Sequence, residues 1–404
     1  MQRATVLRGG LLVLLSCTLC APRSTAKTVV IPRWAVSSND NKQFLDNGVL
    51  SVLPAPVKED TVSFIDLSTT PPKLAFELEA PGSSNGPPLS VAVTPTESLA
   101  LVTAPMKLDP ANPAKAIPDN RITVIDMKVT PPKVIGTVTA GDSPSGISIS
   151  RDGKLALVAN RNSGTLSVLS IAGKVVTNVG TVPVSDLAKK PIPESKSTAS
   201  VAISPDGKLA IATNDGDSRM TLLKVEGTTV TRVKDFWAGV RPYSVDIASN
   251  GRFAIVANVG GAQGDVDTVS LIDLEVLAPL TPHVVDTISV GLTPEGMKIS
   301  PDSTYAVVVL ENGTNKAPSF PFYNTKGKLV VVKIEGKTLR RGPEIDIGQW
   351  CQGAAFTADS KSILVGCMVS KDVQVFSYDG HTLKDTGTRI ALSGGSAAIR
   401  TAEP

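Results

Sequence analysis

The sequence contains few histidine, cysteine and aromatic residues. Its 404 residues include 2 His, 4 Cys and 4% aromatics, and the formal charge is only +3. So few histidines argue against a metal centre built from imidazoles, and so few aromatics leave little surface for stacking nucleic-acid bases. A near-neutral chain also lacks the basic excess that binding to phosphate backbones requires. We therefore expect no nucleic-acid partner.

Motifs for cofactors and metals are missing as well. No CxxCH haem motif, P-loop or strand-linked GxGxxG occurs, so no cofactor is expected. Asn214–Asp217 and Asp265–Asp267 faintly resemble calcium loops but lack the remaining ligand positions, and we interpret them as polar turns rather than metal sites. His283 and His381 fall in segments expected at the outside of the fold, which argues against a Ser-His-Asp site.

Long apolar runs are absent beyond the N-terminus, so we expect no membrane span. Arg3 and Arg8 precede a short apolar run, and small residues at 24–26 then offer a cleavage site before Lys27. This order is typical of a secretory signal peptide, which we place at residues 1–26. The mature protein is expected to be exported to a periplasm or to the extracellular space.

Cleavage would change the charge balance. It removes three arginines and no acid, leaving 37 basic and 37 acidic residues. A neutral protein has no electrostatic preference for nucleic acid or membranes, and we expect a monomer. A lipoprotein signal with a lipid anchor at Cys17 is an alternative, which we favour less because the apolar run before Cys17 is very short.

Residues 27–404 form a sevenfold repeat. The segment Ile147–Asn160 recurs as Val201–Asn214 and Val245–Asn258, and weaker copies precede and follow them. The residues at the central turns of the seven copies are Asp40, Thr96, Asp152, Asp206, Asn250, Asp302 and Asp359. A proline stands eight residues before five of them, at Pro32, Pro88, Pro144, Pro242 and Pro294. The mean repeat length of 54 residues lets seven units fill this part of the chain.

Each unit has the pattern of four strands. Two apolar segments flank an S-x-D-G-type turn, whose Gly or Ser suits the bulge position of a hairpin. A β-branched third segment follows, as in Ile122–Asp126, and a fourth comes after a short turn, as in Lys133–Val138. This pattern predicts an all-β fold, a seven-bladed β-propeller of four-stranded antiparallel blades. Gly394–Ile399 resembles one more first strand, which leaves open how the ring closes.

The repeat resembles that of the YVTN-repeat, lactonase-like β-propeller family. The resemblance lies in Leu157–Asn160 and Ile255–Asn258, each followed by a Ser- and Val-containing strand, and it covers nearly all of residues 28–392. It implies the propeller fold more than an activity. The family's members include sugar-acid lactonases, muconate-lactonizing enzymes, amine-dehydrogenase heavy chains and cell-surface propellers.

One face of the predicted propeller carries long loops between second and third strands, at 107–120, 260–267 and 313–326. Unequal loops on a rigid scaffold are typical of a binding surface. Residues seven or nine positions before each turn residue should surround the channel mouth on this face. The polar and aromatic ones are Arg33, Arg241, Tyr243, Glu295, Trp350 and Gln352. We interpret them as a pocket for a small polar or anionic ligand; the alternative is Arg–Glu pairing at a solvated rim.

Two residue pairs have predicted structural roles. Asp246 and Lys298 occupy equivalent positions of adjacent blades, which favours an ion pair between blades over an acid–base couple. Cys351 and Cys367 are equidistant from Asp359, so they should face each other across two antiparallel strands and form a disulfide. The alternative is two free buried thiols.

The leading functional hypothesis is binding or scaffolding without catalysis, for a small polar ligand or a partner protein at the loop-bearing channel face. The alternative is a lactonase-like hydrolase or isomerase acting on a sugar-acid or muconate-type lactone. In that case Arg33 and Arg241 would polarise the carbonyl and Glu295 would act as the acid.

Overall fold

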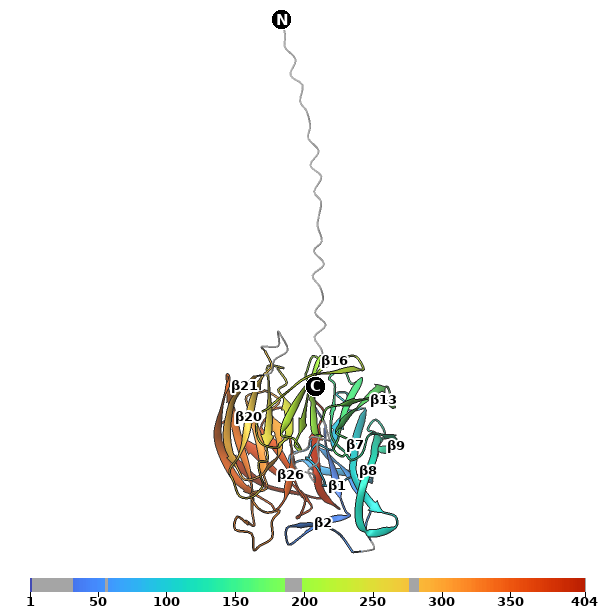
Figure 1. Cartoon of the computed structure of the whole chain (residues 1–404), viewed down its shortest axis with the longest axis vertical. Helices are drawn as coiled ribbons and strands as arrows, with labels where there is room; N and C mark the ends of the chain where they lie inside the picture. Colours follow the sequence, from blue (N-terminus) through green and yellow to red (C-terminus); the bar gives the residue numbers. More distant parts are fainter. Residues whose placement is uncertain (2–31, 55–56, 186–197, 276–282, 404) are drawn as a thin grey trace.

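The computed structural model describes residue 1 and residues 32–54, 57–185, 198–275 and 283–403, and these residues form strands and no helix. Seven four-stranded antiparallel sheets follow one another around a ring, from blue to red in Figure 1. The predicted seven-bladed propeller is therefore confirmed. The predicted signal peptide beyond residue 1, and Cys17 within it, lie outside the described residues. None of the described residues belongs to a helix long and apolar enough to cross a membrane.

The strands of each blade are given from the channel outward. Blade one contains β30 (Gly395–Thr401), β1 (Trp34–Asp40), β4 (Thr61–Asp66) and β5 (Lys73–Glu79). Blade two contains β6 (Val91–Val93), β7 (Leu99–Asp109), β8 (Asn112–Asp126) and β9 (Lys133–Thr139). Blade three contains β10 (Pro144–Ile149), β11 (Leu155–Asn160), β12 (Thr165–Ala172) and β13 (Val175–Pro183). Blade four contains β14 (Thr198–Ile203), β15 (Leu209–Asn214), β16 (Arg219–Glu226) and β17 (Thr229–Phe236).

The remaining blades have the same order. Blade five contains β18 (Pro242–Ile247), β19 (Phe253–Asn258), β20 (Asp267–Asp273) and β21 (His283–Gly291). Blade six contains β22 (Pro294–Ile299), β23 (Tyr305–Leu310), β24 (Gly327–Glu335) and β25 (Thr338–Ile347). Blade seven contains β26 (Cys351–Phe356), β27 (Ser362–Cys367), β28 (Asp372–Tyr378) and β29 (Leu383–Ala391). A separate hairpin, β2 (Gln43–Asp46) and β3 (Val49–Val52), lies between β1 and β4.

The repeated turn is held by its own side chains. In blade three, Ser150 Oγ donates to Asp152 Oδ1 at 2.6 Å and accepts the backbone N–H of Leu155 at 3.0 Å. Gly153 then takes the left-handed conformation, with φ of 70°. Blades four, six and seven repeat the Ser/Thr–Asp bond, so the sequence repeat marks a turn that its hydroxyl and carboxylate stabilise locally.

The C-terminal strand closes the ring. β30 pairs antiparallel with β1, with Val36 opposite Arg400, and takes the innermost place of blade one. The predicted register of blade one is therefore wrong, because β1 is its second strand. Asp40 does not mark a first hairpin turn. Instead its carboxylate accepts the backbone N–H groups of Lys42 and Gln43 at 2.9 and 3.0 Å, which organises the chain ahead of the β2–β3 hairpin.

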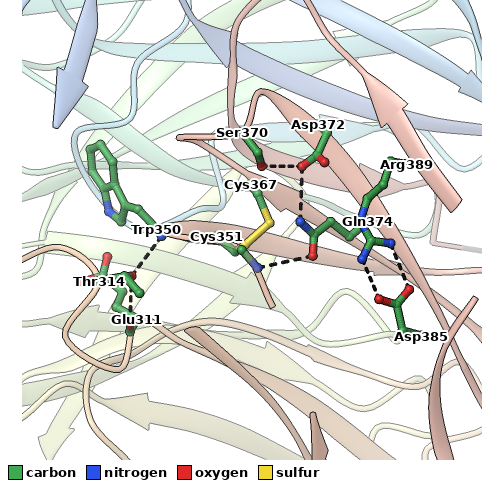
Figure 2. The surroundings of a disulfide bond; sticks show 11 residues. Glu311, Thr314, Trp350, Cys351, Cys367, Ser370, Asp372, Gln374, Asp385 and Arg389 are labelled. Atoms are coloured by element: carbon green, nitrogen blue, oxygen red, sulfur yellow. Dashed lines mark hydrogen bonds and ion pairs between the residues drawn. A yellow bond between two sulfur atoms is a disulfide. The ribbon is translucent and has the colours of Figure 1, made fainter. Parts of the chain in front are cut away.

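Apolar residues from neighbouring blades pack face to face between the sheets. Phe64, Phe356 and Phe376 are among the largest fully buried side chains. Each such ring stabilises the fold by roughly 1.5–3 kcal/mol relative to leaving it in water. The predicted disulfide is confirmed, since Cys351 and Cys367 are directly opposite in the ladder and bonded (Figure 2).

Candidate functional site

The two faces of the ring differ. We call the face with the connections between second and third strands the loop face, and the one with the repeated S-x-D-G turns the turn face. The β2–β3 hairpin and the outer end of the β7–β8 ribbon extend at the loop face, the lower end of Figure 1. The predicted long loop at 107–120 is thus mostly strand, and the connection 41–60 of blade one is a further long one.

Irregular inner strands build the site at the loop-face end of the channel. The ladders of β18, β22 and β26 with their second strands are interrupted after the first residue of each inner strand. The preceding residues Arg241, Thr293 and Trp350 have positive φ values of 52°, 54° and 46°. A bulge frees residues from the ladder and re-aims their side chains. In blades five and six it places Tyr243 and Glu295 at the channel.

A cavity of about 280 Å³ lies at this end of the channel. Tyr243, Glu295, Glu311 and Trp350 contribute to its wall. The remaining lining residues are Leu45, Gly48, Leu50, Ser84, Asn85, Gly86, Asn315 and Lys316. Polar groups therefore converge on a concave space large enough for a small ligand.

The roof of this cavity is the β2–β3 hairpin of blade one. Its tip reaches blade six, where a Cβ on Gly48 would collide with the backbone of Lys316 and Ala317. Gly48 has a φ of 80°, a left-handed conformation that glycine adopts without strain. The close approach thus depends on glycine, and it lays Leu45 and Leu50 over the polar cavity.

Two carboxyl groups meet at the cavity. Glu311 is fully buried and accepts a long hydrogen bond of 3.4 Å from Gln352 Nε2, whereas Glu295 is partly exposed. Burial, and then the charge of Glu295, raise the pKa of Glu311 well above its ordinary value. Burial also raises the pKa of Glu295, although hydrogen bonds with Glu311 and Gln352, and then the charges of the nearby arginines, oppose the rise. The pair therefore retains a proton that separate carboxylates would lose.

The loop carrying Glu311 is tied to blade seven. Thr314 Oγ1 donates to the Glu311 carbonyl at 2.7 Å and accepts the backbone N–H of Trp350 at 2.9 Å (Figure 2). Trp350 directly precedes the disulfide at Cys351, so the bridge lies beside the residue that orients this loop.

A buried ion pair lies on the other side of Tyr243. Arg161 Nη2 and Asp215 Oδ2 are 3.2 Å apart, and the Arg161 guanidinium lies 5.4 Å from the centre of the Tyr243 ring. Burial, with Glu295, raises the pKa of Tyr243 well above its ordinary value, so the phenol stays neutral. Arg161 Nε and Nη1 and Asp215 Oδ1 find no hydrogen-bond partner among the described residues.

The predicted ligand-binding residues are only partly brought together. Tyr243, Glu295 and Trp350 line the cavity, and Gln352 lies behind it against Glu311. Arg241 is beside the cavity and directs Nη1 to the Gly260 carbonyl at 3.4 Å.

The placement of Arg33 at the channel mouth is wrong. Because β1 is a second strand, Arg33 stands at its turn-face end, where its side chain pairs with Asp66 at 3.0 Å. Its backbone N–H donates to Glu97, in the β6–β7 turn, at 2.9 Å.

Sequence reasoning missed Arg161, Asp215 and Glu311. Each directly follows the last residue of a second strand: β11, β15 and β23 respectively. The signal that could have identified them is a charged residue at the position directly after a second strand. This position lies next to the channel rather than on the outer loop.

The turn-face end of the channel has a separate ionic cluster. Lys298 Nζ lies 3.0 Å from both carboxylate oxygens of Asp246, which confirms the predicted ion pair between blades. Lys298 also contacts Glu403, and the buried Arg400 guanidinium donates to the Ala354 carbonyl at 2.9 Å. This cluster joins the C-terminal segment to blades five, six and seven, which is a structural role.

The histidines lie at the outside, as expected. His283 begins β21, an outermost strand, and His381 lies in the turn between β28 and β29. Among the described residues, no group of three or more His, Cys, Asp or Glu side chains is placed to hold a metal ion.

Comparisons with known proteins identify the fold class. No family model and no curated protein match the chain. A periplasmic gluconolactonase of Pseudomonas aeruginosa superposes with a TM-score of 0.66 at 18% identity, over 92% of this chain and 99% of that one. A candidate 6-phosphogluconolactonase of Bacteroides uniformis gives 0.68 at 15% identity, over 91% and 99%. A functionally unknown protein of Desulfotomaculum acetoxidans gives 0.65 at 15%, over 92% and 99%.

The chain is thus similar in fold to lactonase-like seven-bladed propellers. At these identities the likeness concerns the fold alone. The YVTN-repeat resemblance stays a prediction, because no family model matches.

Proposed function

We propose that the loop-face cavity binds a small polar lactone and hydrolyses its ring ester. The observation that carries this proposal is the Glu295–Glu311 pair, a proton-retaining pair of carboxyl groups at the wall of a cavity. The fold supports it, since solved structures with the same architecture include a periplasmic gluconolactonase. This function was the alternative hypothesis from the sequence.

Both members of the pair line the cavity, and Glu295 is the more exposed of the two. As a base, it would take a proton from a water molecule whose oxygen forms a bond to the lactone carbonyl carbon. When the ring C–O bond breaks, the same carboxyl group would return the proton to the departing ring oxygen. One water is consumed, one hydroxy acid is formed, and the enzyme ends in its starting state.

Glu311 would act as a positioning residue. Burial and the charge of Glu295 raise the pKa of Glu311, so Glu311 retains its proton. Its hydrogen bond lowers the pKa of Glu295, which favours the ionised form that a general base needs. Lys316 and Asn85 on the cavity wall could donate to the carbonyl oxygen as it gains negative charge. Trp350 and Tyr243 would bound the sugar ring with apolar surface.

Binding without turnover, the leading hypothesis from the sequence, is the second candidate. The hairpin favours it, because its tip packs on the backbone of blade six and adds Leu45, Gly48 and Leu50 to the wall of the cavity. These residues add contact surface for a ligand and no group that can transfer a proton.

The test is lactone hydrolysis by the protein expressed from Lys27. The substrates are γ- and δ-lactones of aldonic acids, and acid release is followed in a pH-stat. We expect turnover that falls at least about 100-fold in Glu295→Gln, the scale of lost acid–base catalysis. Glu79→Gln, a change of the same kind on exposed β5, is the matched control and should keep full activity.

The same lactones separate the two candidates in a thermal-shift assay. Stabilisation without turnover, abolished by Tyr243→Ala, would identify a binding protein. If no lactone is hydrolysed and none stabilises the protein, the hydrolase proposal is refuted.

A further inference from the structure

One repeat position of the inner strands forms a ring around the channel near the turn face. Its residues pair with equivalent residues of the second strands, for example with Leu157 in blade three and Ile211 in blade four. From blade one to blade seven they are Arg400, Ala92, Ser148, Ala202, Asp246, Lys298 and Ala355. Three of these residues are alanines, and two of the three charged ones are cations.

The alanines leave space inside the ring. A cavity of about 50 Å³ lies there, with Ala92 and Ala202 in its wall and the inner strands of blades two to five around it. Arg400 reaches the same cavity from β30. One water molecule needs only ~10–15 Å³ of such volume, so a small ion fits together with water. Two cavities, of about 80 and 440 Å³, share Thr401 with it and lead to the turn face, which gives an ion a way in.

Arg400 brings a buried positive charge to this cavity. The residue is 8% exposed, and its Nη1 donates to the carbonyl groups of Ala354 and Ile399 at 2.9 and 3.1 Å. Among the residues that the structure describes, no carboxylate forms an ion pair with the guanidinium, and Nε and Nη2 have no acceptor. Burial lowers the pKa of Arg400, because the charged form loses its hydration. A buried cation without a counter-ion costs free energy, which a bound anion would recover.

The carboxylates nearby already serve another cation. Both oxygens of Asp246 accept Lys298 Nζ at 3.0 Å, and Oδ2 also accepts a backbone N–H at 2.8 Å. Glu403 contacts the same ammonium group, and Arg151 is close enough to act on the charge of Glu403. In the described part of this cluster the three cations, Arg400 included, thus outnumber the two carboxylates by one. A bound monoanion would balance them.

We propose that the cavity binds a small monovalent anion, of the chloride or formate type, at Nε and Nη2 of Arg400. Ser148 supplies a further donor, because its Oγ accepts the backbone N–H of Ile203 at 3.2 Å and keeps its own proton to donate. The small volume and apolar walls exclude sulfate and phosphate, which carry more charge and more water.

An anion at this place would tie β30, the strand that closes the ring, to blade three. The inference does not depend on hydrolysis, since the cavity lies toward the turn face and shares no lining residue with the cavity of Glu295 and Glu311.

The experiment is thermal unfolding in sodium chloride, sodium formate and sodium morpholinoethanesulfonate at equal ionic strength. The third anion is too large for the cavity. We expect the midpoint to rise by about 2 °C for each tenfold increase in chloride or formate above its Kd, and to stay constant in the sulfonate. The salt with the larger rise identifies the anion. Equal midpoints in the three salts at every concentration would overturn the proposal.

Two variants locate the effect. Arg400→Met removes the cation, and Ala202→Val fills the cavity without changing a charge, so each should abolish the difference between the salts. The second variant keeps the test valid if the first does not fold. Arg389→Met, at an exposed arginine paired with Asp385, is the matched control and should respond as the wild type does. A response that persists in both cavity variants would place the anion elsewhere and overturn the proposal.

Discussion

Replacing both bridged cysteines with serine should destabilise the propeller by an amount that the structure allows us to calculate. Cys351 and Cys367 are 16 residues apart in sequence. Cross-linking a loop of this length lowers the entropy of the unfolded chain by the equivalent of about 3 kcal/mol at 25 °C. At ~2.1 cal/mol/K per residue, a domain of about 370 residues changes in stability by ~0.8 kcal/mol per degree near its midpoint. The variant should therefore unfold about 4 °C below the wild type.

The assay is thermal unfolding followed by circular dichroism, with and without dithiothreitol. Reductant should lower the midpoint of the wild type by the same 4 °C or so and leave the double variant unchanged. Val365→Ala, in the same strand β27, is the control. It creates a cavity and lowers the midpoint, but it should retain the sensitivity to reductant. Equal midpoints for wild type and double variant, or equal effects of reductant on both, would refute the reasoning.

Three further outcomes follow from the described contacts. Lys298→Met leaves Asp246 buried without its partner and should lower the free energy of unfolding, measured in urea, by roughly 3–5 kcal/mol. The double variant Lys298→Met/Asp246→Leu should recover much of this loss. Equal stability of the single variant and the wild type would contradict the ion pair's role. The raised pKa of Glu311 means that the folded state holds its proton more tightly than the unfolded state does, so the stability that this proton contributes is present below about pH 4.5 and is lost as the pH rises through the raised value. Glu311→Gln should therefore gain stability relative to the wild type as the pH increases. Parallel curves of stability against pH for the two proteins would argue against a buried pair. Gly48→Val should displace the hairpin roof, because a side chain there collides with blade six; faster proteolysis between β2 and β3 with an unchanged thermal midpoint is expected, and unchanged proteolysis would show that the roof does not depend on this contact.

Local repetition made most of the fold predictable. Ser150 and Asp152 form their turn from neighbouring residues alone, so the same letters in other blades predict the same hairpin. Blade one departs from the repeat because its inner strand, β30, comes from the other end of the chain. No residue near Asp40 in the sequence indicates that β30 lies beside β1.

The candidate site was predictable only where it follows the repeat. Tyr243 and Glu295 occupy equivalent positions of successive inner strands, and equivalent positions of a repeat occupy equivalent places in space. Glu311 belongs to a second strand, and its partnership with Glu295 exists only after the bulged strands are assembled. The hairpin over the cavity interrupts the repeat, so no periodic pattern predicts it.

The placement of β30 also determines when the molecule can finish folding. Ser37 and Ser396 share a hydrogen bond across 359 positions of sequence. Blade one stays without its inner strand until β30 has been synthesised, whereas blades two to seven can pair their strands as they emerge. A growing chain therefore exposes the edge of β1 while all the other blades are made, and the pairing of β30 is the step that covers it.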